Sequence, residues 1–264
     1  MPATETKPYR LSCLELRGGN DAVAYPAEIA GLAAWVSSRP LSPATHGGDL
    51  HYLSLCSRGE LARVVLADVA GHGEVVSAVA DRLREALRQN VERFDQAILI
   101  RELNDAFLQG ADGVQFATAF VFSYQSKLDE LRYTNAGHLP PLWYRSQERK
   151  WFLTESIEDA AGMSDLPLGL ISGTPYTQTA ARLEHEDILV LYTDGITECR
   201  NPLGAPLGIH GFLALAEALP LGPPTVIGPM LTKAVDGFRG MAPSIDDETV
   251  VVLQRLPNSP DRGE

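Results

Sequence analysis

The stretch Leu61-Ala62-Arg63-Val64-Val65-Leu66-Ala67-Asp68-Val69 decides the fold, because an apolar strand pattern ends there in an aspartate. Another apolar run, residues 51–55, precedes it, and the residues between the two, Ser57-Arg58-Gly59-Glu60, have the composition of a turn. The two runs therefore predict a β-hairpin. After Asp68 the apolar residues change to a helical period over residues 74–94, so a helix follows the hairpin directly.

The rest of the chain repeats this order of strands followed by helices. We expect strands over residues 11–16, 29–38, 116–124, 131–134, 142–144, 150–153, 183–193 and 249–256, and a turn over residues 17–21. We expect further helices after Asp95, which can cap one that Gly110 closes, and over residues 212–219 and 226–238. Strands and helices do not alternate regularly, which argues against a doubly wound parallel sheet. Antiparallel sheets with helices packed outside them, an α+β fold, are favoured.

No stretch has the composition of an interdomain linker, so we expect one domain over residues 9–256, with flexible termini at 1–8 and 257–264. With 34 acidic and 22 basic residues the formal net charge is -12, which argues against nucleic acid or an anionic membrane as the main partner. The three cysteines lack CxxC spacing, and no apolar run reaches the ~20 residues of a spanning helix. We expect a cytoplasmic protein without a signal peptide.

Four aspartates each lie at a strand end or in a glycine-marked turn: Asp49, Asp68, Asp194 and Asp246. A carboxylate at the end of an apolar strand is costly unless a positive group satisfies it, and four together would repel one another. Hard divalent ions such as Mg²⁺ or Mn²⁺ prefer such oxygen ligands. Two ions roughly 3.5–4 Å apart could share the carboxylates and lower the pKa of a bridging water. The pattern predicts a two-metal hydrolase.

Asp247 is adjacent to Asp246 at the start of the last predicted strand. Because side chains alternate along a strand, only one of the two can point to a given face, and sequence leaves open which one does.

Six motifs occur in one order: Gly47-Gly48-Asp49, Leu66-Ala67-Asp68-Val69-Ala70-Gly71-His72-Gly73, Tyr133-Thr134-Asn135-Ala136-Gly137-His138-Leu139-Pro140-Pro141-Leu142, Leu166-Pro167-Leu168-Gly169-Leu170, Leu191-Tyr192-Thr193-Asp194-Gly195-Ile196-Thr197-Glu198 and Asp246-Asp247-Glu248-Thr249. The series resembles the bacterial branch of the type 2C metal-dependent protein serine/threonine phosphatases, that of sporulation stage II protein E and the stress sigma-factor regulators. The resemblance covers roughly residues 46–253, and the first 45 residues do not follow the family pattern.

The resemblance implies a four-layer α-β-β-α sandwich of two antiparallel sheets flanked by helices, with two Mn²⁺ or Mg²⁺ ions at one edge. Asp68 would bridge both ions, the backbone carbonyl of Val69 would add a ligand, and Asp49, Asp194 and either Asp246 or Asp247 would complete the set. The implied substrate is phosphoserine or phosphothreonine on an anti-sigma-factor antagonist protein. One departure is that the family's Gly-Gly-Asp-Phe-Tyr-Asp motif here continues as Leu50-His51-Tyr52 after Asp49.

His72 is a candidate general acid toward the leaving alkoxide, with a turn histidine as the alternative, and the nucleophile is expected to be a metal-bridging water. Asn135 is expected to bond to backbone in a turn, and His138 to be structural. Two other functions stay open: a non-catalytic, partner-binding pseudophosphatase and a phosphohydrolase of small molecules. A homodimer is one of the assemblies that the sequence leaves open.

Overall fold

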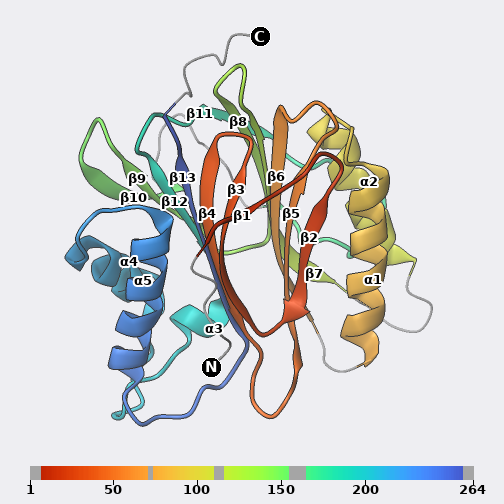
Figure 1. Cartoon of the computed structure of the whole chain (residues 1–264). Helices are drawn as coiled ribbons and strands as arrows, with labels where there is room; N and C mark the ends of the chain where they lie inside the picture. Colours follow the sequence, from red (N-terminus) through yellow and green to blue (C-terminus); the bar gives the residue numbers. More distant parts are fainter. Residues whose placement is uncertain (1–6, 71–73, 110–115, 155–164, 258–264) are drawn as a thin grey trace.

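Two β-sheets lie face to face in the computed structural model, which describes residues 7–70, 74–109, 116–154 and 165–257 (Figure 1). Within these residues one sheet has seven strands in the order β1-β3-β4-β13-β12-β9-β10, and the other has six in the order β11-β8-β7-β6-β5-β2. Neighbouring strands pair antiparallel, except that β1 and β3 are parallel.

The seven-stranded sheet consists of β1 (Tyr9–Arg10), β3 (Val23–Ile29), β4 (Leu32–Arg39), β13 (Glu248–Arg255), β12 (Ile188–Tyr192), β9 (Leu142–Arg145) and β10 (Lys150–Leu153). The six-stranded sheet consists of β11 (Thr179–Arg182), β8 (Glu130–Ala136), β7 (Ala117–Gln125), β6 (Leu61–Val69), β5 (His46–Leu55) and β2 (Leu16–Asp21).

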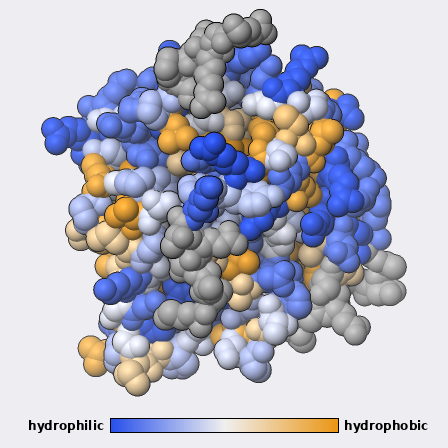
Figure 2. All heavy atoms as spheres, in the orientation of Figure 1, coloured by the Kyte–Doolittle hydropathy of each residue, from blue (hydrophilic) through white to orange (hydrophobic). Residues whose placement is uncertain are grey.

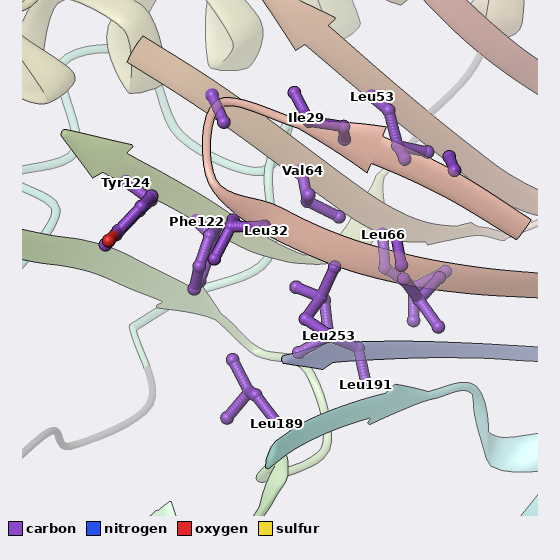
Figure 3. Close-up of a cluster of buried hydrophobic side chains, with 14 of the residues drawn as sticks. Ile29, Leu32, Leu53, Val64, Leu66, Phe122, Tyr124, Leu189, Leu191 and Leu253 are labelled. Atoms are coloured by element: carbon purple, nitrogen blue, oxygen red, sulfur yellow. The ribbon is translucent and has the colours of Figure 1, made fainter. Parts of the chain in front are cut away.

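The inner faces of the two sheets form the central core, as Figure 3 shows. Every second residue of a strand points to the same face, so the apolar alternation of β5 and β6 directs one set of side chains inward. Residues from both sheets meet there, including Leu53, Val64, Leu66, Phe122, Leu189, Leu191 and Leu253. Full burial of each aliphatic side chain contributes about 1.5–3 kcal/mol relative to exposure, which holds the sheets together.

The outer face of each sheet is covered by helices. The helices α1 (Glu74–Gln89) and α2 (Gln96–Leu108) share a buried apolar cluster with β5, β6 and β7. On the other side, α4 (Gly208–Ala218) and α5 (Pro224–Arg239) share a cluster with β4, β12 and β13. The short helix α3 (Asp194–Thr197) follows β12. The layers are therefore α-β-β-α, and the predicted α+β sandwich is confirmed.

Local sequence accounts for how the helices begin and pack. Asp95 caps α2 as expected, because its side chain accepts hydrogen bonds from the backbone amides of Ala97 and Ile98. On α5, a Cβ at Gly228 would lie 2.1 Å from a ring carbon of Trp35, so only glycine lets the helix approach β4 this closely. Figure 2 shows mainly hydrophilic residues over the outward side of α1, in agreement with its amphipathic pattern.

The N-terminal prediction is wrong. Strand β2 occupies residues 16–21, where a turn was expected, and residues 11–15 contain no strand. The glycine pair that indicates a turn instead allows close pairing at the sheet edge, because a Cβ at Gly18 would lie 1.9 Å from the carbonyl oxygen of His51 on β5. Residues 32–38 of the strand predicted over 29–38 lie in β4, whereas its hairpin partner β3 and the edge strand β11 were not foreseen. The single domain over 9–256 stays a prediction.

Candidate metal centre

The hairpin that decides the fold places two of the predicted acids side by side. Asp49 on β5 is the direct cross-strand partner of Asp68 on β6. Such partners have Cβ atoms about 4.5–5.5 Å apart on one face of the sheet. Asp49 is only 3% exposed, and its Oδ2 accepts a 2.6 Å hydrogen bond from the hydroxyl of Thr193, the residue after β12 of the opposite sheet. The pair therefore points into the end of the sandwich.

Thr193 holds the second strand end in place. Its backbone amide donates to the carbonyl of Thr249, and its hydroxyl oxygen accepts from the amide of Thr249 at 2.9 Å. It is also the N-cap residue of α3, which begins with Asp194. One side chain thus joins β12, β13 and Asp49. Sequence reasoning missed this residue, although its place between a buried strand and Asp194-Gly195 marked a tight junction.

Gly195 brings Asp194 against the segment that carries the paired aspartates. A Cβ at Gly195 would lie 1.9 Å from the carbonyl oxygen of Asp247 and 3.3 Å from the Cβ of Asp246. Any side chain there would push the two segments apart. The glycine after Asp194 is therefore required for this close approach.

The two adjacent aspartates have different surroundings. The carboxylate of Asp247 accepts hydrogen bonds from the backbone amides of Leu41 and Gly48, the former at 2.6 Å. The side chain of Asp246 is exposed and accepts from the amide of Asp247 at 2.8 Å. Asp247 thus braces the Gly47-Gly48 segment against β13.

Gly48 faces a cluster of oxygen atoms. A Cβ built on it would lie 3.1 Å from the carbonyl oxygen of Val69 and 3.7 Å from Oδ1 of Asp68. The same point is 3.5 Å from Oδ2 of Asp247. The carbonyl of Val69 and the carboxylate of Asp68 are oxygen donors of the kind that hard divalent cations select, whereas Asp247 is engaged by backbone amides. The chemistry of these oxygen donors fits the expected ions.

Mutual repulsion adds to the effect of burial on the acids. The pKa of Asp68 is raised to about 7, first by burial and then by the charges of Asp194, Asp246, Asp247 and Glu198. The pKa of Asp194 is also raised, first by burial and then by the charges of Asp246 and Glu198. Burial raises the pKa of Asp49 well above its usual value, against the lowering effect of the Thr193 hydrogen bond. Cations between these groups would relieve the repulsion.

The acids share one region without forming a closed ligand shell. Across the described parts of the chain, no three His, Cys, Asp or Glu side chains converge in an arrangement that could hold one ion. Glu198, which the sequence reasoning did not single out, acts on Asp68 and Asp194 through its charge. His72, the candidate general acid, lies outside the described residues.

An ion-pair network between α5, β4 and Glu248 anchors the segment that contains Asp246 and Asp247. Arg239 on α5 pairs with the buried Glu248, which also accepts from the hydroxyl of Ser244 at 2.8 Å. Arg39 on β4 lies 2.9 Å from Asp236 of α5 and 3.8 Å from Glu248. The start of β13 is therefore anchored to both a strand and a helix.

His138 lies near the centre but is occupied by structural contacts. Its Nδ1 is 2.9 Å from the hydroxyl of Thr118, the cross-strand partner of Asp68 on β7. Its backbone amide donates to Oδ1 of Asn135, which confirms the expected turn role of that asparagine. Burial lowers the pKa of His138 to about 4, so its ring is neutral at pH 7.

Comparison with known proteins relates the chain to one family. A family model described as stage II sporulation protein E matches residues 58–256. Phosphoserine phosphatase RsbU of Bacillus subtilis (strain 168) is 27% identical over 146 residues, 55% of this chain and 42% of that protein. Phosphoserine phosphatase RsbP of the same organism is 20% identical over 51% of this chain and 33% of that protein. The chain thus spans less than half the length of these two relatives.

Solved structures share the fold. The RsbU and RsbW domains of Rv1364c from Mycobacterium tuberculosis match with a TM-score of 0.70 and 25% identity, over 91% of this chain and 64% of that one. The PP2C phosphatase domain of SpoIIE from Bacillus subtilis, with a fragment of its regulatory domain, matches with a TM-score of 0.69 and 18% identity, over 84% and 63%. The catalytic domain of PstP, solved in complex with 2 manganese ions, matches with a TM-score of 0.59 and 14% identity, over 86% and 99%.

Proposed function

The chain belongs to the stage II sporulation protein E family of PP2C-type phosphatase domains, and from this premise we propose that it hydrolyses phosphoserine or phosphothreonine on a regulatory protein. The observation that carries the proposal is the pairing of Asp49 with Asp68 beside Gly48, with Asp194 and Asp246 near enough for their charges to act on Asp68. Structural requirements alone do not explain why four acids share this end of a sandwich.

The proposed ligands are Asp49, Asp68, the carbonyl of Val69, Asp194 and Asp246. When bound, two Mn²⁺ or Mg²⁺ ions would supply Lewis-acid charge to the phosphoryl group and activate a water. The chain's own contribution is to hold the oxygens of Asp49, Asp68 and Val69 on paired strands, which costs less entropy than ordering a loop. Asp194 begins α3, and Asp246 lies in the segment that leads into β13.

We assign Asp246, and not Asp247, as the ligand of the adjacent pair. The carboxylate of Asp247 already accepts backbone hydrogen bonds from Leu41 and Gly48, and these fix the segment that leads into Asp49. The charges of both residues act on Asp68, but only that of Asp246 acts on Asp194, and the Cβ of Asp246 lies 3.3 Å from a Cβ built on Gly195. Asp247 serves as the brace that holds Gly48 close to the metal-facing oxygens.

The proposed substrate is a phosphorylated anti-sigma-factor antagonist. The curated relatives are named phosphoserine phosphatases, and the M. tuberculosis structure contains an RsbW domain beside an RsbU domain. We propose a cytoplasmic setting, which the free thiols of Cys13, Cys56 and Cys199 favour. No helix in the described residues is long and apolar enough to cross a membrane.

The test is release of phosphate from a phosphoserine protein with and without Mn²⁺, compared with release from nucleotides. We expect Mn²⁺-dependent release from the protein substrate that is lost in Asp68→Asn and Asp194→Asn and kept in Asp105→Asn, whose exposed carboxylate lies on α2. Preference for nucleotides would favour the small-molecule phosphohydrolase. Binding of the phosphoprotein without turnover would favour the non-catalytic alternative.

A further inference from the structure

Asp68 has a neighbour on each side in a row of side chains that crosses the six-stranded sheet. Asp49 on β5 is its cross-strand partner on one side, and Thr118 on β7 is its partner on the other. Such partners lie on one face of the sheet with Cβ atoms about 4.5–5.5 Å apart. The hydroxyl oxygen of Thr118 lies 2.9 Å from Nδ1 of the buried His138, which follows β8. The row therefore continues from the acidic pair to this histidine.

The backbone around His138 is held in place by contacts at both of its ends. Its amide donates a hydrogen bond to Oδ1 of Asn135 at 2.8 Å. The carbonyl of Pro140 accepts a 2.8 Å hydrogen bond from the hydroxyl of Tyr192, the last residue of β12. The segment that carries the imidazole is thus joined to the opposite sheet.

The ring of His138 also faces the end of β12. Burial lowers its pKa to about 4, against the raising effect of a hydrogen bond to the backbone of Tyr192. This contact is long or bent, because Nε2 has no partner of normal hydrogen-bond geometry among the described residues. A hydrogen bond that raises the pKa is one that the ring donates, so we assign the proton to Nε2. Nδ1 then accepts from the hydroxyl of Thr118.

Two links between the sheets therefore lie on either side of Asp68. The first is the hydrogen bond that the hydroxyl of Thr193 donates to the acid on β5. The second passes from the neighbouring residue on β7 through His138 to Tyr192. Both links end at consecutive residues of the chain, which lead directly into Asp194. The two acids are held relative to each other from both sides.

We propose that His138 is a positioning residue of the metal centre, which holds Asp68 in its place relative to Asp194 by joining Thr118 to the end of β12. The proposal rests on the proposed function, because it requires that these acids bind metal. His138 acts through its two partners and touches neither the ions nor the phosphoryl group. A neutral imidazole suits this role, because it accepts on one side, donates on the other and brings no charge that would repel cations.

The test measures Mn²⁺ affinity by calorimetry in protein first stripped of metal, so that the site is observed without turnover. His138→Leu removes both ring nitrogens and should weaken Mn²⁺ binding about 10–100-fold, the usual effect of removing a residue that supports metal ligands. His138→Asn keeps an acceptor near the position of Nδ1 and should recover most of the affinity.

His51→Leu is the matched control. His51 is also buried, at 1% exposed, and lies two residues after Asp49 on β5. Neither of its ring nitrogens has a hydrogen-bond partner among the residues that the structure describes. Because no link between the sheets passes through it, its replacement should leave the Mn²⁺ affinity unchanged.

Thr118→Val tests the same link from its other end. It removes the hydroxyl and keeps the shape of the side chain, and Thr118 is only half-buried, so this variant should fold even if His138→Leu does not. It should also weaken Mn²⁺ binding. The double variant Thr118→Val/His138→Leu should bind as weakly as His138→Leu alone, because both changes break one link.

Three results would overturn the positioning role: wild-type Mn²⁺ affinity in Thr118→Val or His138→Leu, an equal loss in His51→Leu, or losses that add in the double variant. A wild-type protein that binds no Mn²⁺ would instead overturn the metal centre itself, and the positioning role with it. The two failures are therefore distinguishable.

Discussion

The hydroxyl of Thr193 donates a 2.6 Å hydrogen bond to Oδ2 of Asp49, and this contact joins the two sheets at the acidic end of the sandwich. The same hydroxyl oxygen accepts from the amide of Thr249. The acidic strand ends of β5 and β12 are thereby held in a fixed relation. A small polar residue that carries no charge links the proposed ligands from opposite sheets.

The first prediction concerns this hydroxyl. Thr193→Val should lower the free energy of unfolding by about 1–3 kcal/mol, because Asp49 and the amide of Thr249 lose a buried partner. It should also weaken Mn²⁺ affinity about 10–100-fold, as loss of a group that orients a ligand does. Urea unfolding and calorimetry measure the two effects. Thr193→Ser keeps the hydroxyl and should remain close to the wild type; equal losses in both variants would contradict the assigned role.

The second prediction separates the paired aspartates. Asp246→Asn should reduce Mn²⁺ binding while leaving unfolding in urea nearly unchanged, since its side chain is exposed. Asp247→Asn should lower the free energy of unfolding by about 1–3 kcal/mol, because it weakens the hydrogen bonds to Leu41 and Gly48. If Asp247→Asn removes metal binding without a loss of stability, the two roles are reversed.

The third prediction concerns Gly195. A methyl group there would meet the carbonyl oxygen of Asp247, so Gly195→Ala should destabilise the protein and displace the Asp246 segment. Gly237→Ala is the matched control, because a Cβ there has no neighbour within 4 Å. In the helix α5 this second change should stabilise by about 0.5–1 kcal/mol. Thermal unfolding of both variants checks the pair, and a neutral Gly195→Ala would show that the close approach is not required.

The fourth prediction is a pH dependence from His138. Its pKa is lowered to about 4 in the folded protein and is about 6.5 in an unfolded chain, so the unfolded state binds more protons between these values. The stability contributed by the neutral ring is therefore present above pH 6.5 and is lost as the pH falls toward 4. Urea unfolding of the wild type and His138→Asn across this range should show a shallower decline in the variant. Parallel curves would contradict the burial of a neutral His138.

Much of the fold could be predicted because its determinants are local. The turn over residues 57–60, the cap at Asp95 and the apolar runs of β6 and β12 each carry their signal within a few neighbouring residues. The edge strand β2 could not be predicted, because Gly18 and Gly19 indicate a turn unless the partner strand is known. Their conformation depends on contact with His51, which is distant in sequence.

The acidic residues of the candidate site could be predicted from the sequence, but the residues that hold them in place could not. Asp49 and Asp68 lie at strand ends whose pairing follows from the hairpin. The roles of Thr193 and Asp247 depend on hydrogen bonds between segments far apart in the chain, to Asp49 and to Gly48. Side-chain alternation predicts that Asp246 and Asp247 point in different directions. Which of the two faces the site depends on the amides of Leu41 and Gly48, which bond to Asp247 and are distant in sequence.

The most direct measurement is a crystal structure of the protein soaked in Mn²⁺, with anomalous scattering used to locate the ions. The account predicts two anomalous peaks among Asp49, Asp68, Asp194 and Asp246, with Asp247 still bonded to the amide of Gly48. Anomalous density that is absent from this acidic end, or that lies elsewhere on the molecule, would contradict it.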